Sequence, residues 1–314
     1  MRSVGFVTDP RYLGHLTGPH HPERPERLEA ITARINESGI AKDLRVLEAS
    51  PAALEWIREI HDAAYIERVR ETCESGSPII DSMDTGICEE SYGIALLAAG
   101  AGLAAADAVA GGGVSAAFAA VRPPGHHATR DTAMGFCLFN NAAIAARYLQ
   151  RKHALPKIFI VDWDVHHGNG TQDAFFEDPT VFYFSIHQWP LYPGTGSALD
   201  KGRGPGEGFT LNAPMPEGCG DDDYRRVFEE RVRPSMESFR PDAVVISAGF
   251  DAHRDDPLAG MRLTEPGFAD LTRIVLGNAR DLCGGRVVSL LEGGYSLGAL
   301  AASVEAHLGS LLRD

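Results

Sequence analysis

Short apolar runs recur along the chain, and each is followed by glycine or polar residues. They are rich in Val, Ile, Ala or Phe and occupy residues 115–121, 157–161, 181–186, 243–247 and 287–291. Continuous apolar runs of this length are typical of strands buried on both faces, as in a parallel sheet covered by helices. The pattern therefore predicts a set of buried, parallel strands.

Segments of helical character lie before, between and after the apolar runs. Ser50 and Pro51 are suited to begin a helix over 52–60, and Gly39 is suited to end one over 25–38. Further helices are predicted over 140–152, 222–239, 265–281 and 296–312. Strands that alternate with helices indicate an α/β protein with a mostly parallel sheet.

The continuity of the chain bears on its domain organisation. Pro234 lies inside the helix predicted over 222–239, and we expect it to kink or split that helix. No internal repeat or linker-like tract interrupts the sequence, which favours a single domain over residues 1–314. The glycine-rich loop 194–208 is longer than the usual connection, and this length favours a functional role.

One segment needs comparison with a membrane span. Between Glu90 and Arg122 the only charged residue is Asp107. Ala and Gly dominate this segment, however, and a glycine triplet at 111–113 interrupts it. A span needs about 20 strongly apolar residues, so we expect a buried helix, a glycine turn and a buried strand, with no membrane association.

Composition and charge limit the classes of molecule that this protein is expected to bind. The net charge of −14 disfavours nucleic acid and anionic membranes and attracts basic substrates, such as lysine-bearing peptides or polyamines. The five cysteines form no Cys-x-x-Cys pair, which favours free thiols in a reducing cytoplasm. No secretory signal is evident. We expect a cytoplasmic protein, and a homo-oligomer is one alternative for its assembly state.

Ionisable or phenolic side chains follow all of the predicted strands. Because ligands bind at the carboxyl ends of the strands in open α/β sheets, we expect these side chains to converge on one site. In chain order they are His126 and His127, the run that begins at Asp162, His187, Asp251 and Tyr295.

The run from Asp162 to His166 has the character of a metal site. Residues two apart in an extended chain point the same way, so Asp162, Asp164 and His166 share one side. Such groups suit a divalent cation, and Asp251, after another strand, strengthens that interpretation. The alternative is an aspartate cluster that caps the next helix.

Two further elements suit catalysis. His126 and His127 follow a rigid Pro-Pro-Gly turn and are placed to exchange protons with a metal-bound water; the alternative is a structural pair. Tyr295 follows two glycines, which permit close approach to a ligand. Its phenol is suited to donate to an oxyanion, or else it is a packed core tyrosine.

Six motifs resemble those of the histone deacetylase family. They stand in the family's order and extend from about residue 20 to about residue 300. The resemblance is closest to the class II and bacterial deacetylase-like branch. The motifs are HHPERPERL (20–28), RPPGHHA (122–128), GFCLFNN (135–141), DWDVHHGNGTQ (162–172), SAGFDAHRDDPL (247–258) and LEGGYS (291–296).

The resemblance implies the arginase-deacetylase fold, a three-layer α/β/α arrangement with a mostly parallel central sheet. It also implies one Zn2+ per chain, held by Asp164, His166 and Asp251. A K+ ion is also implied, at a site made by Asp162, Asp164, His166, Ser185 and Ile186.

Catalytic roles follow from the same resemblance. His126 and His127 match the tandem histidines of the family, with His127 as general base. Asp162 is expected to orient His126, and Asn169 stands where a partner of His127 is expected. In class I members that position is an aspartate, so the asparagine favours class II. Tyr295 matches the tyrosine that stabilises the transition state.

The substrate-binding residues are also carried over from the family. Gly135 and Phe136 match one wall of the acyl-lysine tunnel, and Tyr192 stands where the opposite wall usually has phenylalanine. Leu258 replaces the glutamate gatekeeper of polyamine-specific relatives, which favours acetyl-lysine over acetylpolyamine. Asp84 is assigned to the rim, where it would bind the substrate backbone.

The sequence thus predicts a zinc-dependent amidohydrolase that removes acetyl groups from N-acetyl-lysine side chains of peptides or proteins. One alternative is a deacetylase of acetylpolyamines or other small acylated amines. An alternative of another class is a non-catalytic relative that binds acyl ligands or partner proteins.

Overall fold

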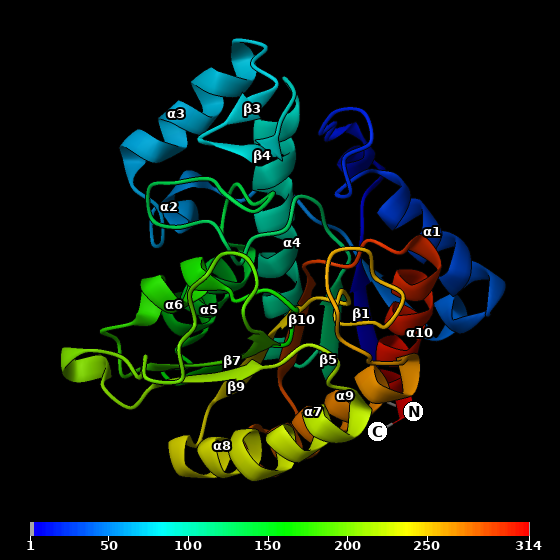
Figure 1. The fold of residues 1–314 in the computed structure, drawn as a ribbon, viewed down its shortest axis with the longest axis vertical. Helices are drawn as coiled ribbons and strands as arrows, with labels where there is room; N and C mark the ends of the chain where they lie inside the picture. Colours follow the sequence, from blue (N-terminus) through cyan, green and yellow to red (C-terminus); the bar gives the residue numbers. More distant parts are fainter. Residues whose placement is uncertain (1–2, 314) are drawn as a thin grey trace.

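The computed structural model describes residues 3–313, in which an eight-stranded sheet lies between two layers of helices (Figure 1). The strand order is β2-β1-β5-β10-β9-β6-β7-β8, and all neighbours pair in parallel. This arrangement confirms the three-layer α/β/α arginase-deacetylase fold class. The strands are β1 (Val4–Val7), β2 (Leu44–Leu47), β5 (Ala116–Ala119), β6 (Ile158–Asp162), β7 (Val181–Gln188), β8 (Thr210–Met215), β9 (Ala243–Ala248) and β10 (Val287–Leu291).

Two helical layers cover the faces of the sheet, as Figure 1 shows. One layer consists of α4 (Ser91–Ala110), α5 (Asn141–His153) and α6 (Asn169–Phe175). The other consists of α1 (Glu26–Glu37), α7 (Asp221–Val227), α8 (Arg233–Phe239), α9 (Glu265–Cys283) and α10 (Leu297–Arg313).

A smaller group of elements projects from the first layer at the top of Figure 1. It contains α3 (Ala63–Glu74) and an antiparallel pair formed by β3 (Ile79–Ile80) and β4 (Ser82–Gly86). The remaining short elements are α2 (Leu54–Ile57) and the 3-10 turns Pro10–Gly14, Ile40–Asp43 and Gly204–Gly206.

The five predicted strands are all present, and they are adjacent in the sheet, in the order β5-β10-β9-β6-β7. Sequence analysis did not identify β1, β2 and β8. Two of these are the edge strands, where one side lacks a neighbouring strand. Their residues are less apolar, since β2 contains Arg45 and β8 contains Asn212 and Pro214.

The helix predicted over 52–60 is shorter than expected. The N-cap of α2 is Ala53, without a side-chain cap. The backbone at Ala52 instead donates a hydrogen bond to the carbonyl of Leu96 in α4, at 2.8 Å. A side chain at Gly100 would collide with the Ser50 carbonyl. Close packing on α4 therefore keeps this segment extended, and the predicted cap is wrong.

Other predicted helix ends are confirmed. The side chain of Asn140 caps α5 by accepting the N–H of Ala143 at 3.0 Å. Gly39 follows α1 with φ of 79°, a left-handed conformation that glycine adopts readily. The helix over 222–239 is split by a π-helical turn, Phe228–Val232, and Pro234 lies in the first turn of α8.

Within the described chain, α4 alone has the length and apolar character of a membrane span. However, 67% of its most apolar stretch is buried inside the protein. It therefore has the burial of a core helix, as the sequence predicts. The five cysteines are free thiols.

Candidate active site

Most of the predicted functional residues follow four neighbouring strands at their carboxyl ends, whereas His187 lies within the fifth strand, β7, which extends to Gln188. His126 and His127 follow β5, Tyr295 follows β10, and Asp251 follows β9. The run that contains Asp164 and His166 follows β6. Since these strands are adjacent and parallel, their ends lie at one edge of the sheet, and side chains distant in sequence meet there.

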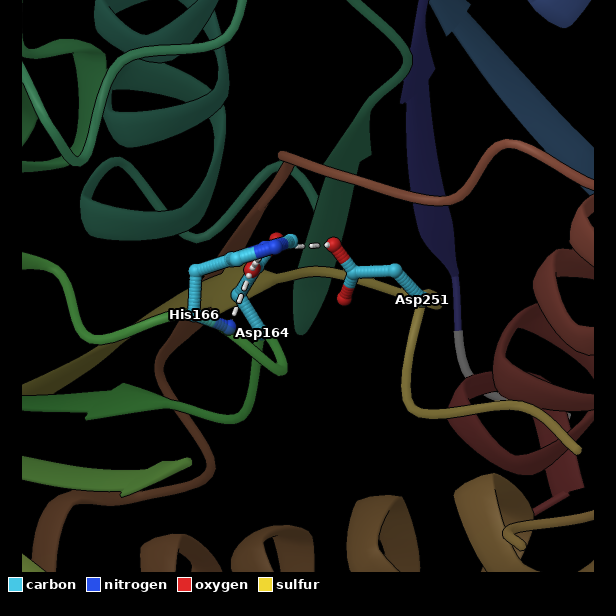
Figure 2. Close-up of side chains that lie close together, drawn as sticks. All are labelled: Asp164, His166 and Asp251. Atoms are coloured by element: carbon cyan, nitrogen blue, oxygen red, sulfur yellow. Dashed lines mark hydrogen bonds and ion pairs between the residues drawn. The ribbon is translucent and has the colours of Figure 1, made fainter. Parts of the chain in front are cut away.

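Asp164, His166 and Asp251 form the cluster shown in Figure 2. The Nδ1 atom of His166 lies 3.1 Å from Oδ1 of Asp164 and 3.1 Å from Oδ2 of Asp251. One candidate ligand atom from each residue lies within 4.8 Å of the others. One imidazole nitrogen and two carboxylates are a donor set that suits a divalent cation, zinc included.

Backbone groups orient both carboxylates. The N–H of Gly293 donates to Oδ2 of Asp164 at 2.8 Å, and the N–H of Val165 donates to Oδ1 of Asp251 at 2.8 Å. A Cβ atom at Gly293 would lie 2.0 Å from Asp251 Oδ2, and one at Gly249 would lie 2.1 Å from Asp164 Oδ2. Only glycine therefore leaves room for the carboxylates at these two positions.

The cluster concentrates negative charge in a buried place. Burial and the neighbouring Asp164 raise the pKa of Asp251 to about 7. Burial also acts to raise the pKa of Asp164, but His126 and the hydrogen bonds of His166 outweigh it, and the pKa is lowered. A divalent cation would relieve the repulsion between the two carboxylates.

The tandem histidines lie beside this cluster with different partners. Nδ1 of His126 lies 3.1 Å from Oδ2 of Asp162, and Nδ1 of His127 lies 2.8 Å from Oδ1 of Asn169. Their ring centroids are 4.0 Å apart. Both pairings match the partners expected from the sequence.

These different partners give the two imidazoles different pKa values. Burial acts to lower the pKa of His126, but Asp164 and Asp162 outweigh it and raise the pKa to about 10. Burial lowers the pKa of His127 well below its usual value, and the neighbouring His126 and His166 lower it further. The site therefore holds a charged His126 beside a neutral His127 near pH 7.

Sequence analysis did not assign two supporting residues. Glu292 follows β10, and its Oε2 accepts the N–H of Gly125 at 2.7 Å and of His126 at 3.1 Å. The hydroxyl of Tyr183 donates to Oδ2 of Asp162 at 3.0 Å. Glu292 also stands directly after a predicted strand, which was a usable signal, whereas Tyr183 lies within an apolar run and gave none.

Tyr295 lies at the edge of the same site. Its ring is 5.8 Å from that of Phe136, and the guanidinium carbon of Arg27 lies 5.1 Å from its centre. Burial raises the pKa of Tyr295 well above its usual value, and Asp251 adds to the effect. The phenol therefore stays protonated and able to donate a hydrogen bond.

A cavity of about 230 Å³ opens onto these groups. All of the predicted substrate-binding residues line it, together with Leu191, which sequence analysis did not select. Phe136 has φ of 69°, an uncommon conformation for a non-glycine residue. The lining residues are Asp84, His127, Gly135, Phe136, His166, Leu191, Tyr192, Leu258 and Tyr295.

Tyr192 and Asp84 lie together at this cavity. The Tyr192 ring packs edge-on against His127, with centroids 5.1 Å apart. Burial raises the pKa of Tyr192, and the neighbouring Asp84 carboxylate raises it further. The hydroxyls of Ser82 and Thr85 also donate to Oδ1 of Asp84. The rim carboxylate is thus surrounded by hydroxyl groups.

Two of the residues predicted to hold potassium, Asp164 and His166, belong to the cluster shown in Figure 2, and the other three lie in β6 and β7. Asp162 in β6 is in register with Ser185 in β7, and Ile186 is fully buried. The hydroxyl of Ser185 is 2.9 Å from Nδ1 of His187. The potassium site stays a prediction.

The glycine-rich loop 194–208 is held to the site at its start. His167 contacts the Thr195 hydroxyl at 2.7 Å, and Nε2 of His187 lies 3.0 Å from the Gly196 carbonyl. A Cβ atom at Gly196 would lie 2.5 Å from His187. These contacts anchor the segment that follows Tyr192.

The fold and the site together define a protein of the deacetylase class of hydrolases. The family model described as "Histone deacetylase domain" matches residues 21–311. Histone deacetylase 14, chloroplastic, of Arabidopsis thaliana is 43% identical to this chain, over 96% of the chain and 75% of the relative. A probable deacetylase of Archaeoglobus fulgidus is 44% identical, over 95% and 83%.

A solved structure agrees with these relatives. The crystal structure of the HDA15 HD domain superposes with a TM-score of 0.93 at 40% identity, and the match covers 99% of this chain and 88% of that one. The chain belongs to the histone deacetylase family.

Proposed function

We propose that this protein is a zinc-dependent amidohydrolase that removes acetyl groups from N-acetyl-lysine side chains. One observation carries the proposal: Asp164, His166 and Asp251 converge beside a cavity that His127 and Tyr295 also line.

The residues fit the metal. Asp164, His166 and Asp251 would hold zinc, because a catalytic zinc site takes three nitrogen or oxygen ligands and keeps one position open. When bound, zinc would supply Lewis acidity to the acyl carbonyl and to the attacking water.

The side chains of the site supply the remaining chemistry. His127, neutral and oriented by Asn169, accepts a proton from the attacking water. The Tyr295 hydroxyl donates a hydrogen bond to the oxygen that becomes negative in the transition state, an interaction worth about 3–4 kcal/mol. One histidine of the pair then protonates the leaving amine, and acetate and a free amine are released.

The cavity supports acetyl-lysine as the substrate class. Phe136 and Tyr192 supply aromatic walls suited to the methylene chain of lysine. Leu258 places an apolar side chain at the lining, with no charge to select a distant cationic amine. The competing substrate class, a small acetylated amine, would use the same catalytic residues.

The test is turnover of a fluorogenic acetyl-lysine peptide by the zinc-loaded protein, with acetylputrescine as the competing substrate. Tyr295→Phe and Asp251→Ala should each abolish at least about 99% of the turnover, and chelation should do the same. Tyr148→Phe is a matched control, because the Tyr148 hydroxyl contacts Asp107 between α4 and α5 rather than the site.

Each outcome assigns a function. Faster turnover of acetylputrescine would favour the small-amine substrate. A non-catalytic binding role would be favoured if the folded, zinc-loaded protein hydrolyses neither of these two substrates, nor substrates with longer acyl groups. We also propose a cytoplasmic location, because the pattern of the five cysteines favours free thiols in a reducing compartment.

A further inference from the structure

One buried carboxylate has no role in the mechanism proposed above. In the sequence it lies between the proposed metal ligand Asp251 and the cavity residue Leu258. Asp256 is 7% exposed. Its Oδ2 accepts the N–H of Tyr295 at 2.7 Å and that of Ser296 at 3.4 Å. Its Oδ1 accepts the N–H of Leu258 at 3.0 Å. One side chain thus joins the loop of Tyr295 to the wall of the cavity.

The turn that carries Asp256 is itself well anchored. The N–H of Asp256 donates to the carbonyl of His253 at 2.9 Å, and the N–H of Arg254 donates to the carbonyl of Leu263 at 2.9 Å. Asp256 therefore holds the Tyr295 loop against a fixed support.

The Tyr295 loop needs such a support because two glycines precede it. Gly294 has φ of 123°, a conformation that side chains rarely permit. The peptide group between Gly294 and Tyr295 is bound on both edges: Arg27 Nε donates to its carbonyl at 2.7 Å, and its N–H donates to Asp256. Together these contacts set the plane of the peptide and hence the direction of the Tyr295 side chain.

We propose that Asp256 is a positioning residue for deacetylation, which holds the Tyr295 hydroxyl where the oxyanion develops and couples it to the Leu258 wall. The inference rests on the proposed function. It adds a residue that touches neither substrate nor metal and acts through the backbone of Tyr295.

The variant Asp256→Asn tests this role with little change in volume. An amide has one acceptor oxygen, so its NH2 group must face either the Leu258 N–H or the Tyr295 N–H. Either orientation breaks the link between the Tyr295 loop and the Leu258 turn that supports it. Because a displaced group costs much in the transition state, kcat should fall about 10- to 100-fold. KM should change less than about 3-fold, because Tyr295 acts chiefly in the transition state.

Two comparisons separate positioning from a general loss of structure. Asp255→Asn is the matched control, because Asp255 is adjacent to Asp256 in the sequence and its own side chain is 63% exposed. In this control, kcat should stay within about 2-fold of the wild type. In a Tyr295→Phe background, Asp256→Asn should cause little further loss, since the hydroxyl that it positions is already absent. Full additivity of the two losses would overturn the proposal.

A crystal structure of Asp256→Asn provides a readout that does not depend on turnover. The Tyr295 ring should be displaced while the sheet is unchanged; an undisplaced ring would overturn the proposal. If the asparagine variant does not fold, Asp256→Glu keeps the charge, shifts the carboxylate by one methylene and serves the same test. A wild-type protein inactive on all acetylated substrates would refute the proposed function, while the structural comparison would still decide the role of Asp256.

Discussion

The Nδ1 atom of His127 lies 2.8 Å from the side-chain oxygen of Asn169, so a neutral amide orients this imidazole. His126, whose ring is 4.0 Å away, faces the Asp162 carboxylate instead. Two adjacent imidazolium ions would repel each other strongly in a buried site. The difference between the partners therefore places the positive charge on His126 and leaves His127 able to accept a proton.

Replacing the neutral partner should change the pH dependence. Asn169→Asp puts a carboxylate beside His127 and should raise its pKa by about 1–3 units. Since the base acts in its neutral form, the acidic limb of the kcat/KM profile should move to higher pH. Asn36→Asp, on the exposed side of α1, is the control. An unchanged acidic limb would show that His127 is not the base.

The carboxylates of the site should make the metal-free protein sensitive to pH. Burial raises the pKa values of Asp251 and Glu292 to about 7, above about 4 in an unfolded chain. At these two groups the folded state then binds extra protons, so the stability that they contribute should fall, on the order of a few kcal/mol, as pH rises from about 4 to about 7. Buried histidines such as His61 and His307, whose pKa values burial lowers to about 4 and about 3, act in the opposite direction. Thermal unfolding of chelated wild-type protein and chelated Asp251→Asn over this pH range isolates the part that Asp251 contributes. Added zinc should remove the Asp251 part of this pH dependence, and identical pH profiles for the two chelated proteins would show that Asp251 does not contribute.

The buried ion network around Glu23 should support the fold. Glu23 is fully buried, and its carboxylate contacts Arg122 at 2.7 Å and Arg27 at 3.1 Å. Glu23→Gln leaves two buried guanidinium groups without their counter-charge and should cost about 3–5 kcal/mol in denaturant unfolding. The control Glu177→Gln breaks an exposed pair with Arg203 and should leave the midpoint unchanged. Equal midpoints for the two variants would contradict this role.

The hydroxyl of Tyr192 should act at the rim rather than at the acyl end of the cavity, because it neighbours Asp84. In Tyr192→Phe, the Asp84 carboxylate loses a competing donor, so KM for an acetyl-lysine peptide should fall about 2- to 10-fold. The order of preference among acetyl, propionyl and butyryl peptides should stay the same. A changed order, with KM unaltered, would place the hydroxyl at the acyl end instead.

The sequence predicted the candidate residues at the strand ends, but it did not predict the supporting contacts that come from distant segments. The Asp-x-Asp-x-His run and Asp251 each follow an apolar run, so the metal cluster could be proposed from spacing and chemistry. The contact between Arg27 and the Gly294 carbonyl joins residues separated by 267 positions. Nothing local to either residue predicts that contact.

The edges of the fold were equally hard to predict. Strand β2 and strand β8 pair on one side only, so their side chains need not form a continuous apolar run. The segment at 50–53 has good capping residues, yet packing on Gly100 of α4 keeps it extended. Tertiary packing there outweighed a local preference worth about 1 kcal/mol.

By itself, the sequence determined the class of fold, the five central strands and the candidate groups that meet at the strand ends. These depend on local properties: apolar periodicity, turn chemistry and the residue types at strand ends. Only the tertiary structure decided which side chains pair with the two histidines, which backbone amides hold the carboxylates, and how Asp256 and Arg27 bind the peptide group before Tyr295. Those relationships depend on distances of about 3 Å between segments far apart in the chain, which are set when the whole sheet and its helices pack.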